Sequence, residues 1–195
     1  MLERIDAAGL RPRRSGVTSP FQRTGKGCDM TVKAAVVGCG QWGRNHVRTL
    51  AGIGALAAIS DNDPDRAAAL SAEHGVPALP LDDILQRHDI QAVVLALPPR
   101  LHAEIGQKIL AAGKDVLIEK PIALAPADAQ ASVALARDRG RVLMVGHILR
   151  FHPVFEEMVR QVEAGRIGTL KHIVATRLGL GPVSYTHLRA HETGR

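Results

Sequence analysis

Three glycines near the start of the chain have the spacing of a turn that binds phosphate groups. Gly38, Gly40 and Gly43 form G-x-G-x-x-G between a short apolar segment and a stretch of helical composition. In such a turn the first glycine permits the tight bend, the second lets the backbone approach a pyrophosphate, and the third allows close packing of helix on strand. The N–H groups and positive dipole end of the following helix then face the phosphates. The spacing therefore predicts a dinucleotide-binding turn.

Asp61 follows this turn at the end of a second apolar segment, about 20 residues further on. A carboxylate there accepts hydrogen bonds from both ribose hydroxyls of an adenosine and repels a 2′-phosphate, so we expect NAD rather than NADP. Arg66 is close enough in sequence to weaken that preference. A merely structural turn is the alternative, and the combination of strand, helix and acid favours dinucleotide binding over it.

Alternating strand and helix patterns surround these residues. The predicted strands are 32–37, 55–60, 76–80 (short at best), 90–97, 115–119 and 142–146, and the predicted helices are 44–54, 64–74, 81–87, 100–112 and 127–139. Strands that alternate with helices are typical of an α/β fold with a doubly wound parallel sheet, the Rossmann arrangement.

Functional groups collect at the carboxyl ends of the predicted strands, where such sheets bind their ligands. For any one histidine, the alternative is a side chain whose hydrogen bonds are made within the protein at a strand or helix end. For the lysine, the alternative is a solvated side chain in a loop. Their convergence with the glycine turn and Asp61 predicts one site. These residues are Leu97, Pro98, His102, Glu119, Lys120, Gly146 and His147.

The composition is that of a globular protein with one sizeable core. Of the 195 residues, 46% are hydrophobic and 23% are charged, which is ordinary. No apolar run approaches the roughly 20 residues of a membrane span, so we expect no membrane partner. The two cysteines, Cys28 and Cys39, are too few for a disulfide framework or a cysteine-built metal site. We expect no metal, and a reducing cytoplasm as the location.

The net charge of +6 lies largely at the two ends of the chain. Residues 1–29 carry six Lys and Arg against three acids, whereas residues 30–183 carry seventeen against fifteen. Aromatic residues for base stacking amount to only 3%. Nucleic-acid binding is therefore not expected.

The first residues differ from the rest. Residues 1–29 lack periodicity and are rich in Arg, Gly, Ser and Pro, so we interpret them as a disordered extension or an upstream start mis-assigned to the gene. Met30 is then the natural start, and residues 30–150 form the predicted NAD-binding domain.

The last residues predict only the start of a second α/β domain, residues 151–182. Within it, Pro153–Ala164 is a predicted helix and Thr169–Leu178 a predicted strand. Residues 183–195 do not continue the pattern and look like translated adapter sequence. The H-x-x-x-H pair His187 and His191 in this tail is therefore not interpreted as a catalytic or metal-binding pair.

Several motifs together resemble one enzyme family. In order they are GCGQWGRNH, the aspartate after the second strand, ALPPRLHAE, VLIEKPIAL and VGHILRFHP. In this order and spacing they resemble the Gfo/Idh/MocA family, named after glucose–fructose oxidoreductase, inositol dehydrogenase and MocA. The resemblance covers about residues 31–182 and implies an NAD-dependent oxidoreductase.

The resemblance also implies roles for individual residues. Lys120 would be catalytic, because an ammonium can hydrogen-bond the oxygen of the alcohol being oxidised and stabilise its alkoxide character. The implied cofactor residues are Gly38, Gly40, Gln41, Trp42 and Gly43 at the pyrophosphate, Asp61 and Asn62 at the adenosine ribose, and Leu97, Pro98, His102 and Glu119 at the nicotinamide side.

Within the family, the tryptophan of the glycine turn, GHILRFHP and the later ATRLGLG resemble the branch that acts on UDP-N-acetylglucosaminuronic acid and related nucleotide sugars. The substrate is then a sugar or UDP-sugar, faced by Lys120, His147, Arg150 and His152. The full-length parent is expected to be a homo-oligomer.

Alternatives to a sugar dehydrogenase stay open. One is a non-catalytic dinucleotide-binding sensor or partner subunit, because fold alone does not decide function. Another is a dehydratase or glycosidase that oxidises its substrate transiently with bound NAD. Because a lone strand of a second domain leaves an unpaired edge, we expect the chain by itself to bind NAD weakly and not to turn over.

Overall fold

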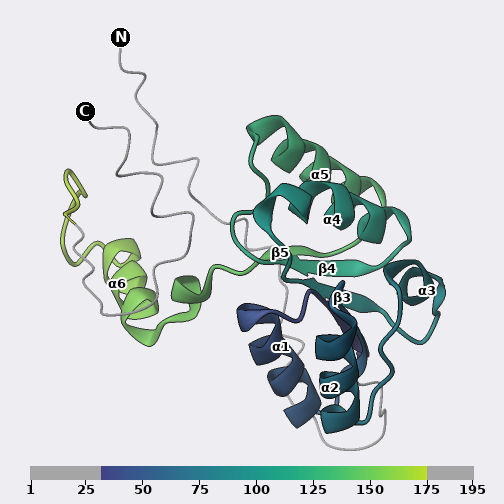
Figure 1. Ribbon diagram of the computed structural model, residues 1–195. Coiled ribbons are helices and arrows are strands. Elements are labelled where there is room, and N and C mark those ends of the chain that lie inside the picture. Colours follow the sequence, from purple (N-terminus) through teal and green to yellow (C-terminus); the bar gives the residue numbers. More distant parts are fainter. Residues whose placement is uncertain (1–31, 175–195) are drawn as a thin grey trace, which may run out of the picture.

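The computed structural model describes residues 32–174. In this part of the chain the strands form one parallel sheet in the order β2-β1-β3-β4-β5 (Figure 1). The predicted parallel α/β architecture is confirmed. The strands are β1 (Ala34–Val37), β2 (Leu56–Ser60), β3 (Ala92–Leu95), β4 (Asp115–Ile118) and β5 (Leu143–Val145).

The helices begin and end close to the residues that the sequence predicts. Helix α2 (Pro64–His74) matches its predicted range: Asp63 accepts a hydrogen bond from the Arg66 N–H at its start, and Gly75 ends it with φ 65°. The other helices are α1 (Gln41–Gly52), α3 (Leu81–Gln86), α4 (His102–Ala111), α5 (Pro126–Asp138) and α6 (Pro153–Glu163), with 3₁₀ turns η2 (Pro99–Leu101) and η3 (Ile148–Phe151).

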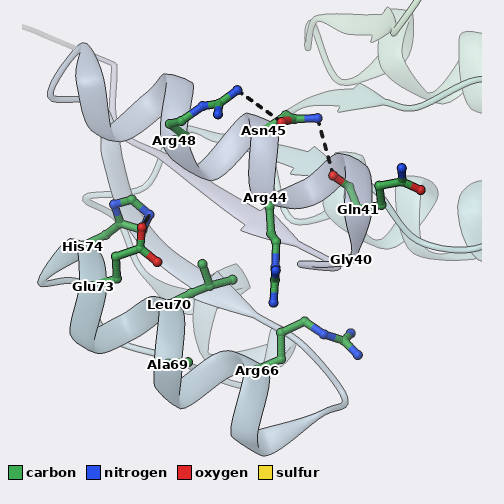
Figure 2. Close-up of a pocket in the computed structure, with 10 residues that line it drawn as sticks. All are labelled: Gly40, Gln41, Arg44, Asn45, Arg48, Arg66, Ala69, Leu70, Glu73 and His74. Atoms are coloured by element: carbon green, nitrogen blue, oxygen red, sulfur yellow. Dashed lines mark hydrogen bonds and ion pairs between the residues drawn. The ribbon is translucent and has the colours of Figure 1, made fainter. Parts of the chain in front are cut away.

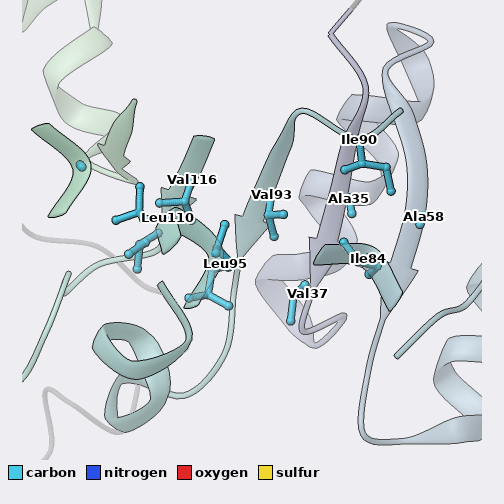
Figure 3. Close-up of a cluster of buried hydrophobic side chains, with 12 residues drawn as sticks. Ala35, Val37, Ala58, Ile84, Ile90, Val93, Leu95, Leu110 and Val116 are labelled. Atoms are coloured by element: carbon cyan, nitrogen blue, oxygen red, sulfur yellow. The ribbon is translucent and has the colours of Figure 1, made fainter. Parts of the chain in front are cut away.

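Helices cover both faces of the sheet (Figure 1). Successive strand side chains point to opposite faces, so each strand contributes to two cores. Val36 packs in the cluster shared with Val47 of α1 and Leu70 of α2. On the other face the strands pack against α3, α4 and α5 (Figure 3). That cluster comprises Ala35, Val37, Ala58, Ile84, Ile90, Val93, Leu95, Ile109, Leu110, Val116, Ile118 and Ala136.

The strand order changes direction at β1. Strand β2 pairs on one side of β1 and β3 on the other, which is the switch point where open α/β sheets bind ligands. The short strand predicted at 76–80 is reduced to one parallel bridge, between Ile59 and Ala78. The carboxyl ends of β1, β2, β3 and β4 lie at one edge of the sheet.

The strand predicted at Thr169–Leu178 is wrong as far as the structure describes it. Residues 169–174 are irregular and exposed. A strand needs a hydrogen-bonding partner, and within residues 32–174 none pairs with this segment. Residues 175–182 of the predicted second domain, the extension 1–29 and the tail 183–195 with His187 and His191 lie outside the described residues.

In the part of the chain that the structure covers, no helix is long and apolar enough to cross a membrane. Residues 32–174 contain no group of three or more His, Cys, Asp or Glu side chains that could hold a metal ion.

Candidate functional site

The glycine turn joins β1 to α1 at the switch point. Gly38 has φ 88°, a left-handed conformation, and a Cβ there would lie 2.6 Å from the carbonyl oxygen of Ala96 in the neighbouring segment. A Cβ on Gly43 would lie 1.8 Å from the carbonyl oxygen of Gly38. Gly43 therefore lets α1 pack against the turn itself, rather than against the strand as the sequence suggested.

Gly40 has the opposite surroundings. A Cβ on Gly40 would have no atom within 4 Å, so the backbone here faces open space. Helix α1 begins at the next residue, Gln41, and no side chain caps its first turn. Gln41 and Trp42 are exposed beside it. Uncapped N–H groups at an open helix start are suited to bind phosphate oxygens, as the motif predicts.

Asp61 connects the end of β2 to the glycine turn. Its Oδ2 accepts a hydrogen bond from the Cys39 N–H at 2.6 Å, and its Oδ1 accepts one from the Asp63 N–H at 2.8 Å. The Arg66 guanidinium approaches both oxygens, at 3.1 and 3.2 Å. The predicted ribose acceptor thus lies beside the turn, with Asn62 exposed next to it.

The electrostatics of this corner favour an ionised carboxylate. Burial by itself would raise the pKa of Asp61, but the Asp63 and Cys39 N–H groups and then the Arg66 guanidinium outweigh it and lower the pKa below 3.8. Burial, and next the charge of Asp61, raise the pKa of the Cys39 thiol to about 11. Cys39 is therefore a protonated, space-filling residue of the turn.

His102 connects the segments after β3 and β4. It is 1% exposed, with Nε2 at 2.7 Å from the carbonyl oxygen of Leu97 and Nδ1 at 2.6 Å from that of Pro121. Both ring nitrogens face the protein interior, so His102 can act on a cofactor only by holding Leu97 and the Lys120–Pro121 turn in place. Pro98 is exposed beside Leu97.

Glu119 lies at the end of β4, between α1 and β5. Its Oε1 is 2.8 Å from His46 Nε2, and the Glu119 side chain is 12% exposed. A Cβ on Gly146 would lie 3.0 Å from its carboxylate, so the glycine leaves room for this side chain. The Glu119 N–H donates to Leu95, which keeps the residue in the sheet ladder.

The candidate substrate residues lie less closely together. Lys120 and His147 are exposed at the ends of β4 and β5. Arg150 lies 5.8 Å from the centre of the Phe155 ring, and His152 Nδ1 accepts a hydrogen bond from the Val154 N–H at the start of α6. The structure thus brings Lys120 to the same sheet edge as the glycine turn. Arg150 and His152 belong to the segment that leads away to α6 (Figure 1).

Sequence reasoning missed His46. Its signal is its place on α1, three residues after Gly43 and one before the buried Val47, which puts an imidazole on the inner face of the helix. The same reasoning gave Arg44 no role. Arg44 follows the third glycine and lines the hollow between α1 and α2.

Comparison with known proteins agrees with this geometry. A family model described as an oxidoreductase family with an NAD-binding Rossmann fold matches residues 32–147. Inositol 2-dehydrogenase 1 of Saccharopolyspora erythraea is 40% identical over 147 residues, which cover 71% of this chain and 43% of that protein.

Two solved structures extend the comparison. UDP-N-acetylglucosamine 3-dehydrogenase of Acidithiobacillus ferrooxidans is 34% identical with a TM-score of 0.62, over 66% of this chain and 41% of that one. A 3-ketoreductase from Actinomadura kijaniata, in complex with NADP and TDP-benzene, is 30% identical with a TM-score of 0.62, over 69% and 42%. The chain spans less than half the length of these relatives, and it belongs to the Gfo/Idh/MocA family of oxidoreductases with an NAD-binding Rossmann fold.

Proposed function

We propose that this chain supplies the cofactor-binding part of an NAD-dependent dehydrogenase that transfers hydride between NAD and a hydroxyl of a sugar or nucleotide sugar. Its relatives are named as dehydrogenases of inositol and of UDP-N-acetylglucosamine, and these names support this substrate class. The observation that carries the proposal is the position of Lys120. It follows β4 at the sheet edge that also holds the glycine turn, beside a carboxylate fixed by His46.

The residues of the site fit a dinucleotide. The open backbone at Gly40 and the uncapped start of α1 would bind its pyrophosphate, and Asp61 its adenosine ribose. When bound, NAD supplies the carbon that accepts the hydride. The ammonium of Lys120 would donate a hydrogen bond to the substrate hydroxyl oxygen and stabilise negative charge on it as the hydride leaves. Glu119 and His102 would hold the segments on either side of that lysine.

The test separates cofactor binding from chemistry. Residues 1–174 are joined to the C-terminal part of the UDP-N-acetylglucosamine 3-dehydrogenase, and NADH formation is followed with UDP-N-acetylglucosamine and with myo-inositol. We expect Lys120→Ala to leave the Kd for NAD+ within about twofold and to lower kcat by at least about 100-fold. Lys108, on α4 and paired with Glu104, provides a matched control as Lys108→Ala.

A non-catalytic dinucleotide-binding module is the second candidate. Arg150 lies over the Phe155 ring and His152 accepts a hydrogen bond from the Val154 N–H. Both side chains thus contact neighbouring residues of the segment and not a substrate position, which favours this candidate. NAD+ binding by the hybrid without NADH formation would support this module and contradict the dehydrogenase. Equal turnover by Lys120→Ala and wild type would instead contradict the catalytic role proposed for Lys120.

The finer substrate, location and assembly are also proposals. The UDP-N-acetylglucosaminuronic acid branch stays a prediction from the motifs of the sequence. So do a cytoplasmic location, a homo-oligomeric parent and the lack of a nucleic-acid partner.

A further inference from the structure

The Glu119 carboxylate lies where three elements meet at the edge of the sheet. It comes from the end of β4, and its Oε1 lies 2.8 Å from Nε2 of His46 on α1. An ionised carboxylate only accepts hydrogen bonds, so the Nε2–H of His46 is the donor. On the β5 side, a Cβ on Gly146 would lie 3.0 Å from Oε2 of Glu119. The carboxylate is therefore held by α1 on one side and has just enough room beside β5 on the other.

Lys120 follows this carboxylate directly, and its ammonium does not pair with it. The Lys120 backbone N–H lies 3.3 Å from Glu119 Oε2, so the carboxylate contacts the main chain of the lysine. Within residues 32–174 the exposed Lys120 ammonium makes no hydrogen bond or ion pair. Lys108 on α4 behaves differently, because its ammonium lies 3.0 Å from the carboxylate of Glu104. Lys120 thus has an acid close by and an ammonium without a partner among these residues.

The contact with His46 explains why this ammonium is free. A lysine side chain is a flexible stem that carries three donors, so Lys120 can reach Glu119 wherever that carboxylate is free to turn. The N–H of His46 keeps the carboxylate on the side of α1. An ammonium already paired with a carboxylate has its charge compensated, and it stabilises negative charge on a substrate oxygen less well than a free one.

We propose that His46 is a positioning residue, which holds the Glu119 carboxylate away from the Lys120 ammonium and so keeps that ammonium available to the substrate hydroxyl. The inference rests on the proposed function, because that function places the substrate hydroxyl at Lys120. His46 acts only through Glu119. Since His46 lies on α1, three residues after Gly43, the helix that would bind the pyrophosphate also sets the state of the lysine.

The experiment measures how readily the Lys120 amine reacts in the 195-residue chain. The chain is acetylated with sulfo-N-hydroxysuccinimide acetate, and the rate at Lys120 is obtained by peptide mass spectrometry, with Lys108 as the internal reference. We expect His46→Leu to slow acetylation of Lys120 about two- to fivefold, the strength of an exposed ion pair with the released Glu119. His46→Gln keeps an N–H donor for Glu119 and should stay within about 1.5-fold of wild type.

A double variant separates a released carboxylate from a distorted turn. In His46→Leu/Glu119→Gln no carboxylate is left to pair with Lys120, so its acetylation should return to within about 1.5-fold of wild type. A double variant as slow as His46→Leu would overturn the inference, because the slowing would then come from altered packing. A wild-type rate in His46→Leu would also overturn it. His46→Ala carries the same expectation as His46→Leu with a smaller side chain, and circular dichroism checks that each variant is folded.

His74→Leu is the matched control. His74 is also an imidazole close to a carboxylate, 3.6 Å from Glu73, but it lies on α2 in the hollow between α1 and α2 (Figure 2). This variant should leave acetylation of Lys120 unchanged, and a slowing equal to that of His46→Leu would overturn the inference.

Binding of NAD+ tests the proposed function separately. Isothermal titration calorimetry of wild type and His46→Leu should give Kd values within about twofold, because His46 contacts Glu119 and not the glycine turn. A wild-type chain that does not bind NAD+ would overturn the proposed function, whatever the acetylation rates are. Normal NAD+ binding with no change of acetylation in His46→Leu would overturn the inference alone.

Discussion

The sheet region and the segment after it differ in how their apolar side chains are covered. In the sheet, Val36, Val93 and Leu95 are fully buried between two layers of helices. In residues 148–174 no side chain of η3 or α6 is buried, and Phe151 and Val154 are 60% and 71% exposed. The first region is held by its core, whereas the second is held by local interactions.

Local interactions are sufficient for α6 because a helix satisfies its own backbone. Pro153 suits its first turn, His152 accepts the Val154 N–H, and Arg160 pairs with Glu157. A strand cannot do this, which is why the segment 169–174 remains irregular among the described residues. Elements with local signals form where they are predicted, and elements that need a distant partner form only where that partner is present.

The largest expected effect on stability comes from a substitution in the glycine turn of the sheet region. Gly43→Ala places a methyl group 1.8 Å from the carbonyl oxygen of Gly38. Both groups belong to the backbone, so the clash can be relieved only by moving α1 or the turn. We expect a loss of about 3 kcal/mol in the free energy of unfolding, the upper end of the usual range for overpacking. Urea denaturation followed by circular dichroism measures it.

Two glycines of the same region serve as controls for this variant. Gly52→Ala, at the end of α1 with nothing within 4 Å, should unfold like wild type. Gly40→Ala also has open space and should keep wild-type stability. It should weaken the binding of NAD+, because its methyl group would occupy the space that we propose for the pyrophosphate. A Gly43→Ala chain as stable as Gly52→Ala would show that the turn is not tightly packed.

Most of the sheet region can be predicted from the sequence, but few of the contacts between its side chains can. The glycine spacing and the strand composition predict the turn, the parallel sheet and the edge where Asp61, Glu119 and Lys120 gather. They do not reveal that His46 contacts the Glu119 carboxylate, 73 residues further along the chain. Nor do they reveal that the Arg66 guanidinium donates a hydrogen bond to the Asp61 carboxylate. Those contacts depend on how α1 and α2 pack on the sheet, and no local pattern encodes that packing.

An effect of intermediate size is expected from two carboxylates with lowered pKa values, one in each region. Asp61 is held within the sheet region, whereas Glu157 on α6 has its pKa lowered to about 2 by exposed hydrogen bonds from Arg160 and Gln161. For Asp61, the lowered pKa stabilises the fold above the ordinary value of 3.8, and that contribution is lost as the pH falls through the folded-state pKa.

We therefore expect Asp61→Asn to lower the free energy of unfolding at pH 7 by about 1.5–3 kcal/mol, the range for hydrogen bonds to a charged group. The difference from wild type should shrink as the pH drops below 3.8. Glu157→Gln should leave stability at pH 7 nearly unchanged, because exposed ion pairs contribute little. Melting temperatures between pH 2.5 and 7 measure both variants. A gap for Asp61→Asn that does not depend on pH would mean that its charge is not what stabilises the fold.

The smallest expected effect on stability comes from making the same change, valine to threonine, once in each region. Val36→Thr puts a hydroxyl into the fully buried cluster between β1 and α1 and should cost about 1–3 kcal/mol. Val154→Thr makes the same change on α6, where the side chain is 71% exposed, and should shift stability by less than about 0.5 kcal/mol. Denaturation of the two variants side by side compares the regions at equal chemistry and nearly equal volume. If Val154→Thr proved as costly as Val36→Thr, the apolar face of α6 would be covered in solution, and the contrast between a core-held and a locally held region would fail.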